Sequence, residues 1–221
     1  DNVKKKLKAD KKYQQELDLL EKIKQTLESG KSARTMSFNE EEKEILKDTY
    51  LLTMKPILYI ANVSETQLAS PFDDSNVKEV VEYAKEENAE VIPLCVKIEE
   101  ELASLDGKDK KEMLEALNLN QSGLDKVIKA SYNLLGLMSF LTAGEPEVRA
   151  WTIKKGTKAP EAAGKIHSDI ERGFIKAEVV SYEDLIECGS MLSAKEKGLV
   201  RQEGKDYIMR DGDIVLFKFN V

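Results

Sequence analysis

The segment Pro56–Glu65, PILYIANVSE, constrains the fold more than any other part of the sequence. Its residues 57–61 form a short apolar run, which is typical of a strand covered on both faces in a parallel sheet. Polar residues, Asn62 and Glu65 among them, follow where open α/β sheets bind their ligands, at the carboxyl end of the strand. An amide and a carboxylate three residues apart can hydrogen-bond the edge of a purine. The segment therefore predicts a strand ending in a loop that recognises a nucleotide base.

The residues that follow predict a parallel α/β arrangement. Ser75 is placed to cap a helix, and residues 90–94 form a second short apolar strand. A strand, a helix and a strand in this order imply parallel pairing. Two strands are too few for a stable doubly wound sheet, so we expect a partial sheet that lacks strands on its amino-terminal side. Further helices are expected at residues 99–105, 110–117 and 124–137, the last capped by Ser122.

The amino-terminal part predicts a pair of helices. Residues 3–29 carry apolar side chains at a spacing of three or four, which marks one stripe on a polar helix, and Gly30 ends it. Ser37 and Glu40 form a capping-box pattern that begins a second helix, with apolar residues between positions 45 and 54. We expect an antiparallel, coiled-coil-like extension whose second helix leads into the Pro56 strand.

From Met138 onward the sequence becomes rich in short β segments separated by glycine. A mixed sheet of about five strands around one helix within some 80 residues fits a β-grasp (ubiquitin-like) module. The strands are expected at residues 139–141, 148–154, 175–182, 205–209 and 214–219, and the helix at 160–167.

Charge and cysteine content narrow the class of protein. The 221 residues carry 34 Lys and Arg against 41 Asp and Glu, so a net charge of −7 argues against general coating of nucleic acid. Cys95 and Cys188 are the only cysteines and lie far apart, which predicts neither a disulfide framework nor a zinc site. No apolar run approaches the roughly 18 residues that span a bilayer. We expect a reduced, cytoplasmic protein without membrane contact.

The segment FLTAGEPEVRAWTIKKGTKAPEAAGKIHSDIERGF, within residues 138–221, resembles the TGS domain of the YchF/Obg-like ATPase family. The segment KPILYIANVSE resembles the base-recognition motif of that family, in which Asn-x-x-Glu replaces the Asn-Lys-x-Asp of ordinary GTPases. By this resemblance residues 1–55 are the distal part of a helical insertion, and residues 56–137 are the carboxyl-terminal part of the nucleotide-binding α/β domain.

The resemblance implies a P-loop NTPase that prefers ATP to GTP, associates with ribosomes or ribosomal RNA, and uses ATP (or GTP) and Mg in its complete form. An Asp accepts two hydrogen bonds from guanine N1 and N2, and a displaced Glu does not reproduce that geometry. The implied base-binding residues are Asn62, Val63, Glu65, Cys95 and Val96.

The phosphate-binding motif is missing from the sequence. A Walker A loop, G-x-x-x-x-G-K-[ST], holds phosphates between a strand and a helix. Gly30-Lys31-Ser32 comes closest, but Gln25 stands where the first glycine is required, and a polar helix precedes it instead of a strand. We interpret these three residues as a helix terminator. The chain therefore resembles the carboxyl-terminal part of a family member, with no catalytic residue and no metal ligand of its own, and we expect it to be inactive and to bind ATP negligibly when isolated.

The segment 149–176 is a candidate contact for RNA or the ribosome. It contains seven Lys or Arg residues against three acidic ones, with Trp151 and Phe174 interleaved. Basic residues beside aromatic ones pair with phosphates and stack on bases, although a solvated charged face around core aromatics is an equally good interpretation. The sole histidine lacks a motif partner for general-base chemistry and is included as a surface residue. The candidate contacts are Arg149, Lys154, Lys155, Lys158, Lys165, His167, Arg172 and Lys176.

Two hypotheses of function remain. In the first, the chain is part of a ribosome-associated regulator that hydrolyses ATP and whose catalytic half is absent here. In the second, it is a noncatalytic module whose helical arm and TGS domain bind RNA or protein without nucleotide. The lysine run at positions 4–12 is a further candidate RNA contact, and the helical arm is a candidate surface for protein partners.

Overall fold

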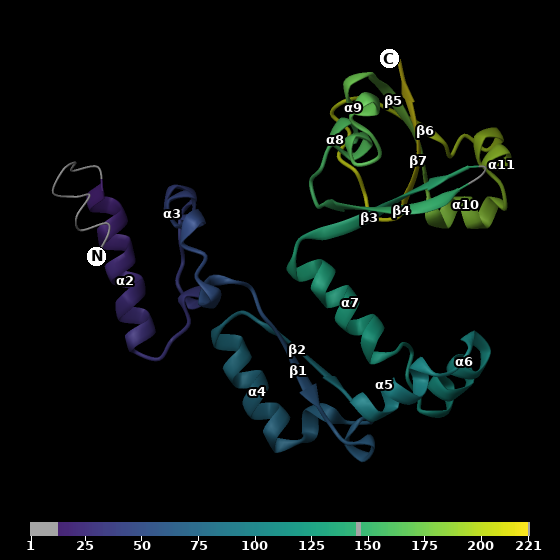
Figure 1. Cartoon of the computed structure of the whole chain (residues 1–221). Coiled ribbons are helices and arrows are strands. Elements are labelled where there is room, and N and C mark those ends of the chain that lie inside the picture. Colours follow the sequence, from purple (N-terminus) through teal and green to yellow (C-terminus); the bar gives the residue numbers. More distant parts are fainter. Residues whose placement is uncertain (1–12, 145–146, 221) are drawn as a thin grey trace. The chain divides into compact units, whose positions relative to one another are not determined.

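A computed structural model describes residues 13–144 and 147–220 of the chain. The chain divides into two compact units, Asp1–Ala130 and Ser131–Val221 (Figure 1). The lysine run predicted to contact RNA at positions 4–12 lies outside the described residues. No helix of the described part is long and apolar enough to cross a membrane.

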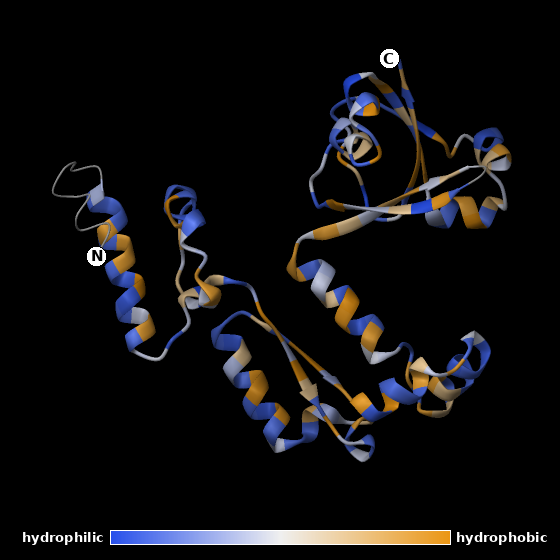
Figure 2. Cartoon of the chain, viewed as in Figure 1, coloured by the Kyte–Doolittle hydropathy of each residue, from blue (hydrophilic) through white to orange (hydrophobic). Residues whose placement is uncertain are grey.

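The first unit begins with a helical segment, residues 13–55, which we call the arm. In Figure 2 apolar residues of helix α2 alternate with polar ones, as expected of an amphipathic helix. Leu19 and Ile23 of α2 are buried against Ala33 and Leu46, and these four residues form the core of the arm. Its elements are α2 (Gln14–Glu28), the 3-10 turn η2 (Ala33–Thr35), α3 (Glu40–Leu46), η3 (Lys47–Thr49) and η4 (Leu52–Met54).

The second helix of the arm differs from its prediction. Its capping box consists of Asn39 and Glu42 rather than Ser37 and Glu40: Asn39 Oδ1 accepts from the Glu42 N–H, and the Glu42 carboxylate accepts from the Asn39 N–H, each at 2.9 Å. Phe38 packs against the arm core, and the backbone of Asn39 is extended. The α-helix ends at Leu46 and is followed by the 3-10 turn η3, which ends at Tyr50 in a left-handed conformation with φ 49°. Residues 45–54 therefore do not form one helical face.

The predicted parallel strand–helix–strand arrangement is confirmed. Strands β1 (Leu58–Asn62) and β2 (Glu90–Leu94) pair in parallel, with Asn62 opposite Leu94 at their carboxyl ends. Helix α4 (Ser75–Glu86) connects them, after the short turns η5 (Glu65–Gln67) and η6 (Pro71–Asp73). Asp74, not Ser75, caps α4, because the Asp74 carboxylate accepts the N–H groups of residues 76 and 77.

The prediction that β1 is covered on both faces is wrong. None of its five residues is buried, and Ile60 is 51% exposed. The sheet has only two strands among the described residues, and β1 pairs with β2 alone. An apolar strand therefore stays half-exposed where a single helix and a single neighbouring strand cover it.

Three helices complete the first unit: α5 (Val96–Ala103), α6 (Gly107–Ala116) and α7 (Gly123–Leu134), the last reaching across the boundary at Ala130. The predicted cap of α7 is confirmed, since Ser122 Oγ accepts the Asp125 N–H at 3.1 Å. A second cap comes from α5. The Glu99 carboxylate accepts the N–H groups of Gly123 and Leu124 at 2.7 and 3.0 Å.

The second unit is a five-stranded mixed sheet in the order β4-β3-β7-β5-β6. Strands β3 and β7 run parallel, and the other neighbours are antiparallel. The main core, which includes Phe140, Ile153 and Val179, lies between the sheet and helices α8 and α9; a smaller core lies under α10 and α11 (Figure 1). The elements are β3 (Leu137–Ala143), β4 (Val148–Lys154), α8 (Ala159–Gly164), α9 (Ser168–Arg172), β5 (Phe174–Ser181), α10 (Tyr182–Cys188), α11 (Met191–Glu196), β6 (Arg201–Glu203) and β7 (Asp213–Phe219).

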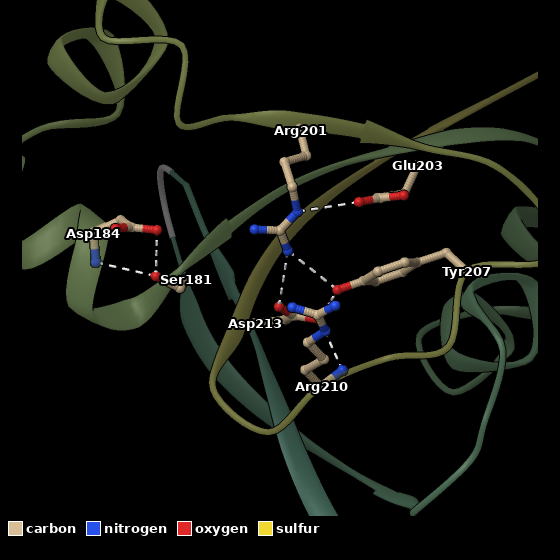
Figure 3. A network of polar contacts seen from close by, with 7 residues as sticks. All are labelled: Ser181, Asp184, Arg201, Glu203, Tyr207, Arg210 and Asp213. Carbon is tan, nitrogen blue, oxygen red and sulfur yellow. Dashed lines mark hydrogen bonds and ion pairs between the residues drawn. The ribbon is translucent and has the colours of Figure 1, made fainter.

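Two predictions in this unit are wrong. Residues 205–209 are a turn with one isolated bridge, Lys158↔Ile208, and the edge strand is β6. The turn is held from within: Asp213, 2% exposed, accepts the Tyr207 hydroxyl and the Arg210 N–H, both at 2.8 Å (Figure 3).

The second error concerns the single helix expected at residues 160–167. Two short helices, α8 and α9, occupy this region, and α10 and α11 were not predicted at all. All four have at most seven residues, which is too short for a clear helical period, and serine caps mark only the last two: Ser181 for α10 and Ser190 for α11.

Candidate functional site

The predicted base-binding residues gather at the carboxyl edge of the two-stranded sheet. The Val96 N–H, at the first residue of α5, donates to Asn62 Oδ1 at 3.1 Å. The Val63 N–H donates to the Leu94 carbonyl at 2.9 Å, and so extends the β1–β2 pairing by one residue. The structure thus brings the loop after β1 against the loop after β2, as the parallel arrangement predicts.

The residues of this edge differ in what they offer a ligand. Asn62 and Val96 are exposed, whereas Val63 and Cys95 are buried at 7% and 4%. The Cys95 side chain packs against Ile98 and Leu102, so only its backbone faces the edge. Among the described residues no acceptor bonds the Asn62 side-chain nitrogen. The edge therefore presents an amide donor, backbone groups and an apolar floor.

Glu65 has a partner that the sequence analysis did not identify. Lys97 Nζ lies 2.6 Å from Glu65 Oε1, and this hydrogen bond raises the pKa of Lys97. The two side chains are 69% and 49% exposed, so the pair contributes little stability and can exchange for a ligand contact. Lys97 lies 32 residues beyond Glu65, and only the pairing of β1 with β2 reveals that they meet.

The segment closest to a phosphate-binding motif, Gly30-Lys31-Ser32, lies just after the end of α2. Gly30, with φ 81°, follows the end of α2, which confirms that Gly30-Lys31-Ser32 terminates a helix. In residues 13–144 and 147–220 no three His, Cys, Asp or Glu side chains are grouped to hold a metal ion.

Several candidate RNA contacts of the second unit are engaged in local interactions. The Arg149 guanidinium lies 4.2 Å above the Trp151 ring. Lys158 Nζ pairs with Asp206 at 2.8 Å, and Lys155 Nζ donates to Asn133 Oδ1 at 3.1 Å. These contacts are exposed, so each lysine can still approach a phosphate at small cost.

The region around α9 gives His167 a structural role. His167 is the cap of α9, and its Nδ1 accepts the Asp169 N–H at 3.2 Å. Arg172 pairs with Asp169 within the same helix. Lys176 Nζ, on β5, donates to Gln202 Oε1 at 3.0 Å.

The eight candidate residues do not share one surface. Arg149, Trp151 and the buried Ile153 are spaced two residues apart along β4, so their side chains share the face that α8 covers. Lys154, the residue after Ile153, points to the opposite face. Lys176 also points away from the core residue Ala177 beside it. The other five candidates lie in or beside the two short helices. Lys155 and Lys158 lie in the loop between β4 and α8, Lys165 and His167 lie between α8 and α9, and Arg172 is the last residue of α9.

One aromatic residue of the predicted RNA contact is unavailable. Phe174 is 5% exposed and packs against Phe217 with ring centroids 6.0 Å apart, so it belongs to the core and cannot stack on a base. Trp151 is half-buried, and its Nε1 donates to Thr142 Oγ1 at 3.0 Å. The core interpretation is therefore correct for Phe174.

Comparison with known proteins finds relatives over almost the whole chain. Residues 137–220 match the family model YchF-GTPase_C, described as a protein of unknown function (DUF933). The ribosome-binding ATPase YchF of Bacillus subtilis (strain 168) is 57% identical over 206 residues, which are 93% of this chain and 56% of that protein. The Escherichia coli O157:H7 YchF is 45% identical over 221 residues, 99% of this chain and 60% of the relative. The Obg-like ATPase 1 of Rattus norvegicus is 44% identical over 216 residues, with 96% and 54% covered.

A solved structure shows the same fold. The structure of the Schizosaccharomyces pombe YchF GTPase superimposes with a TM-score of 0.80 at 36% identity, covering 94% of this chain and 55% of that one. The protein is thus of the mixed α/β class, with a partial parallel sheet and a separate mixed-sheet unit. The chain is strongly homologous to the YchF ribosome-binding ATPases, and its carboxyl-terminal residues match the YchF-GTPase_C family model. It spans a little more than half the length of the curated relatives it matches.

Proposed function

We propose that this chain carries the base-recognising edge and the ribosome-contacting module of an ATPase. The observation that carries the proposal is the hydrogen bond from the Val96 N–H to Asn62 Oδ1, which joins the two loops at the ligand-binding edge of the sheet. The names of its relatives, ribosome-binding ATPases, support the same function. In this proposal the full-length protein hydrolyses ATP, and this chain selects the base.

Base selection follows from the groups at the edge. Asn62 offers a side-chain amide donor, and backbone groups of Val63, Cys95 and Val96 line the site. Glu65 is held by Lys97 through one carboxylate oxygen. A glutamate displaced from the position of the GTPase aspartate does not reproduce the geometry that accepts both the N1–H and the N2–H of guanine, which favours adenine.

The second unit supports the assignment of a TGS domain. In the sheet order β4-β3-β7-β5-β6, the strands that come first and last along this unit, β3 and β7, are parallel neighbours. Helix α8 packs on one face of the sheet, as in a β-grasp module. The domains proposed are residues 1–55 as the distal part of a coiled-coil-like helical insertion, 56–137 as part of the nucleotide-binding domain, and 138–221 as the TGS domain. The compact units divide slightly earlier, at Ala130.

Phosphate and Mg binding belong, in this proposal, to segments outside this chain. The 221 residues contain no Walker A motif. When bound, Mg would neutralise the charge of the phosphates. This chain would orient the base and place the TGS module on the ribosome, in the cytoplasm. The alternative is a noncatalytic module that binds RNA or protein without nucleotide, and the missing motif is the observation that favours it.

Nucleotide titrations separate the two functions. In the full-length protein, Asn62→Ala is expected to weaken ATP binding about 10-fold or more, because one hydrogen bond to a ligand of this kind contributes about 1.5 kcal/mol. Asn76→Ala, an exposed residue of α4, is the matched control. Unchanged ATP affinity in Asn62→Ala would contradict base recognition, and micromolar ATP binding to the isolated chain in calorimetry would contradict the dependence on outside segments.

Ribosome pelleting tests the second half of the proposal. The double reversal Lys154→Glu with Lys155→Glu is expected to reduce co-sedimentation at low salt several-fold, because phosphate contacts dominate such binding. Reversal of Lys108 and Lys111 on α6, which are equally exposed, is the control for net charge. Equal pelleting of wild type and the double variant would exclude these lysines as the contact.

A further inference from the structure

A buried ion pair joins the arm to the sheet that carries the base edge. Arg34 Nη1 donates to Glu87 Oε1 at 3.0 Å, and the side chains are only 14% and 3% exposed. The same guanidinium donates from Nε to the Lys55 carbonyl at 2.9 Å and from Nη1 to Ser32 Oγ at 3.0 Å. Arg34 therefore contacts the arm, the residue before Pro56, and the end of α4 at once.

The other oxygen of Glu87 extends this contact into β1. Tyr59, the second residue of that strand, donates its hydroxyl to Glu87 Oε2 at 2.6 Å. Hydrogen bonding from Ser32 and Tyr59 holds the pKa of Glu87 below its usual value, and the bond to Glu87 raises the pKa of Tyr59 to about 12. We call Arg34, Glu87 and Tyr59 the clamp.

The clamp acts on a strand whose other contacts are its pairing with β2 and its packing against α4, where the Tyr59 and Tyr83 ring centroids lie 6.2 Å apart. β1 pairs with β2 alone among the described residues, and none of its side chains is buried. Tyr59 lies three residues before Asn62, about 10 Å along a strand that rises about 3.3 Å per residue. An extended strand transmits an axial shift over that distance, so a displaced Tyr59 moves Asn62 relative to the Val96 N–H.

We propose that Arg34, acting through Glu87 and Tyr59, is a positioning residue for the base edge and couples the arm to base recognition. The inference rests on the proposed function for its consequence, because the edge is taken to be the base site. Coupling between two binding sites is reciprocal. A partner that binds the arm and opens the clamp would weaken adenine binding, and adenine would in turn weaken that partner.

Hydrogen exchange in this chain tests the clamp without any nucleotide. In Arg34→Met the Val96 and Val63 amides are expected to exchange at least 10-fold faster than in wild type, while amides of α6 keep their rates. Lys43→Met, an exposed ion-pair residue of the arm, is the matched control and should change neither amide. Tyr59→Phe is the second variant, for the case in which Arg34→Met unfolds the unit. It keeps the Arg34–Glu87 pair and removes one hydroxyl, so the Val96 and Val63 amides are expected to exchange faster than in wild type, by a smaller factor.

The outcomes separate this inference from the proposed function. If the Val96 and Val63 amides exchange at wild-type rates in both variants, while the amides beside Arg34 exchange faster, the clamp stabilises only its own surroundings and the inference is wrong. In the full-length protein, Arg34→Met is expected to raise the KM for ATP several-fold with kcat retained. If Asn62→Ala leaves ATP affinity unchanged while the exchange result holds, the base site fails and the mechanical coupling stands.

Discussion

Single buried polar residues stabilise the conformations of loops in this protein. Asp213 is the clearest case, because it is almost fully buried and is the acceptor for both Tyr207 and the Arg210 backbone (Figure 3). Arg201 Nη2 lies 3.7 Å from its other oxygen. This set of contacts explains why residues 204–212 form an ordered turn instead of the predicted strand.

Replacement of Asp213 by Ala is expected to destabilise the second unit by about 3 kcal/mol, because Tyr207 and Arg201 lose a buried partner. Asp206→Ala is the control, since the Asp206 side chain is 94% exposed and its pair with Lys158 contributes little. Urea unfolding of both variants measures the difference. Equal midpoints for the two would show that the buried carboxylate adds nothing.

At the scale of elements, the helices of the first unit are fastened by side chains from other elements. Glu99 of α5 bonds the first two N–H groups of α7, where a negative charge also favours the helix dipole. Gly123 is required at this contact: a Cβ there would lie 2.8 Å from both Glu99 Oε1 and Leu94 Cβ. The carboxyl edge of the β1–β2 sheet and α7 are therefore linked through α5, because α5 begins at Val96.

Glu99→Ala is expected to destabilise the first unit by about 1–2 kcal/mol and to accelerate exchange at the first amides of α7. Glu100→Ala, an exposed neighbour on the same helix, is the matched control and should change stability by less than about 0.5 kcal/mol. Thermal unfolding and hydrogen exchange give the two readouts. Unchanged protection at Gly123 and Leu124 would show that Ser122 alone caps the helix.

At the scale of the whole molecule, the two units have separate hydrophobic cores. The second unit has a five-stranded sheet with its own main core, whereas the described residues of the first form two strands and several small clusters. The second unit should therefore be the more stable of the two, because it buries more apolar side chains in one contiguous core.

A fragment of residues 131–221 is expected to fold alone and to keep the unfolding midpoint that this region has in the whole chain. Calorimetry of the whole chain should show two transitions, the lower one from the first unit. The amide NMR spectrum of the fragment can be compared directly with the signals of the same residues in the whole chain. A single cooperative transition, together with an unfolded fragment, would contradict independent folding.

Much of the local structure was predictable from the sequence. The β1–α4–β2 unit follows from two apolar runs around a capped helix, and the Ser122 cap of α7 follows from its position before Leu124. The burial of β1 was not predictable in this way, because the number of neighbouring strands decides it. The capping box of α3 consists of Asn39 and Glu42, two residues beyond the predicted pattern of Ser37 and Glu40.

The candidate site divides in the same manner. Asn62, Val63 and Glu65 are evident from one contiguous motif, and their resemblance to a known family supplied Cys95 and Val96. Lys97, Arg34 and Glu87 were missed because their partners lie 32, 53 and 28 residues away in the sequence. No local pattern marks a contact of that range.

The sequence by itself determined the β1–α4–β2 order, the resemblance to a known family and the position of the polar loop after β1, since short-range patterning carries that information. The tertiary structure alone decided which charges are buried together, which face each basic residue occupies, and how the arm is fastened to β1. These depend on contacts between distant residues, and such contacts exist only once strands have paired and helices have packed.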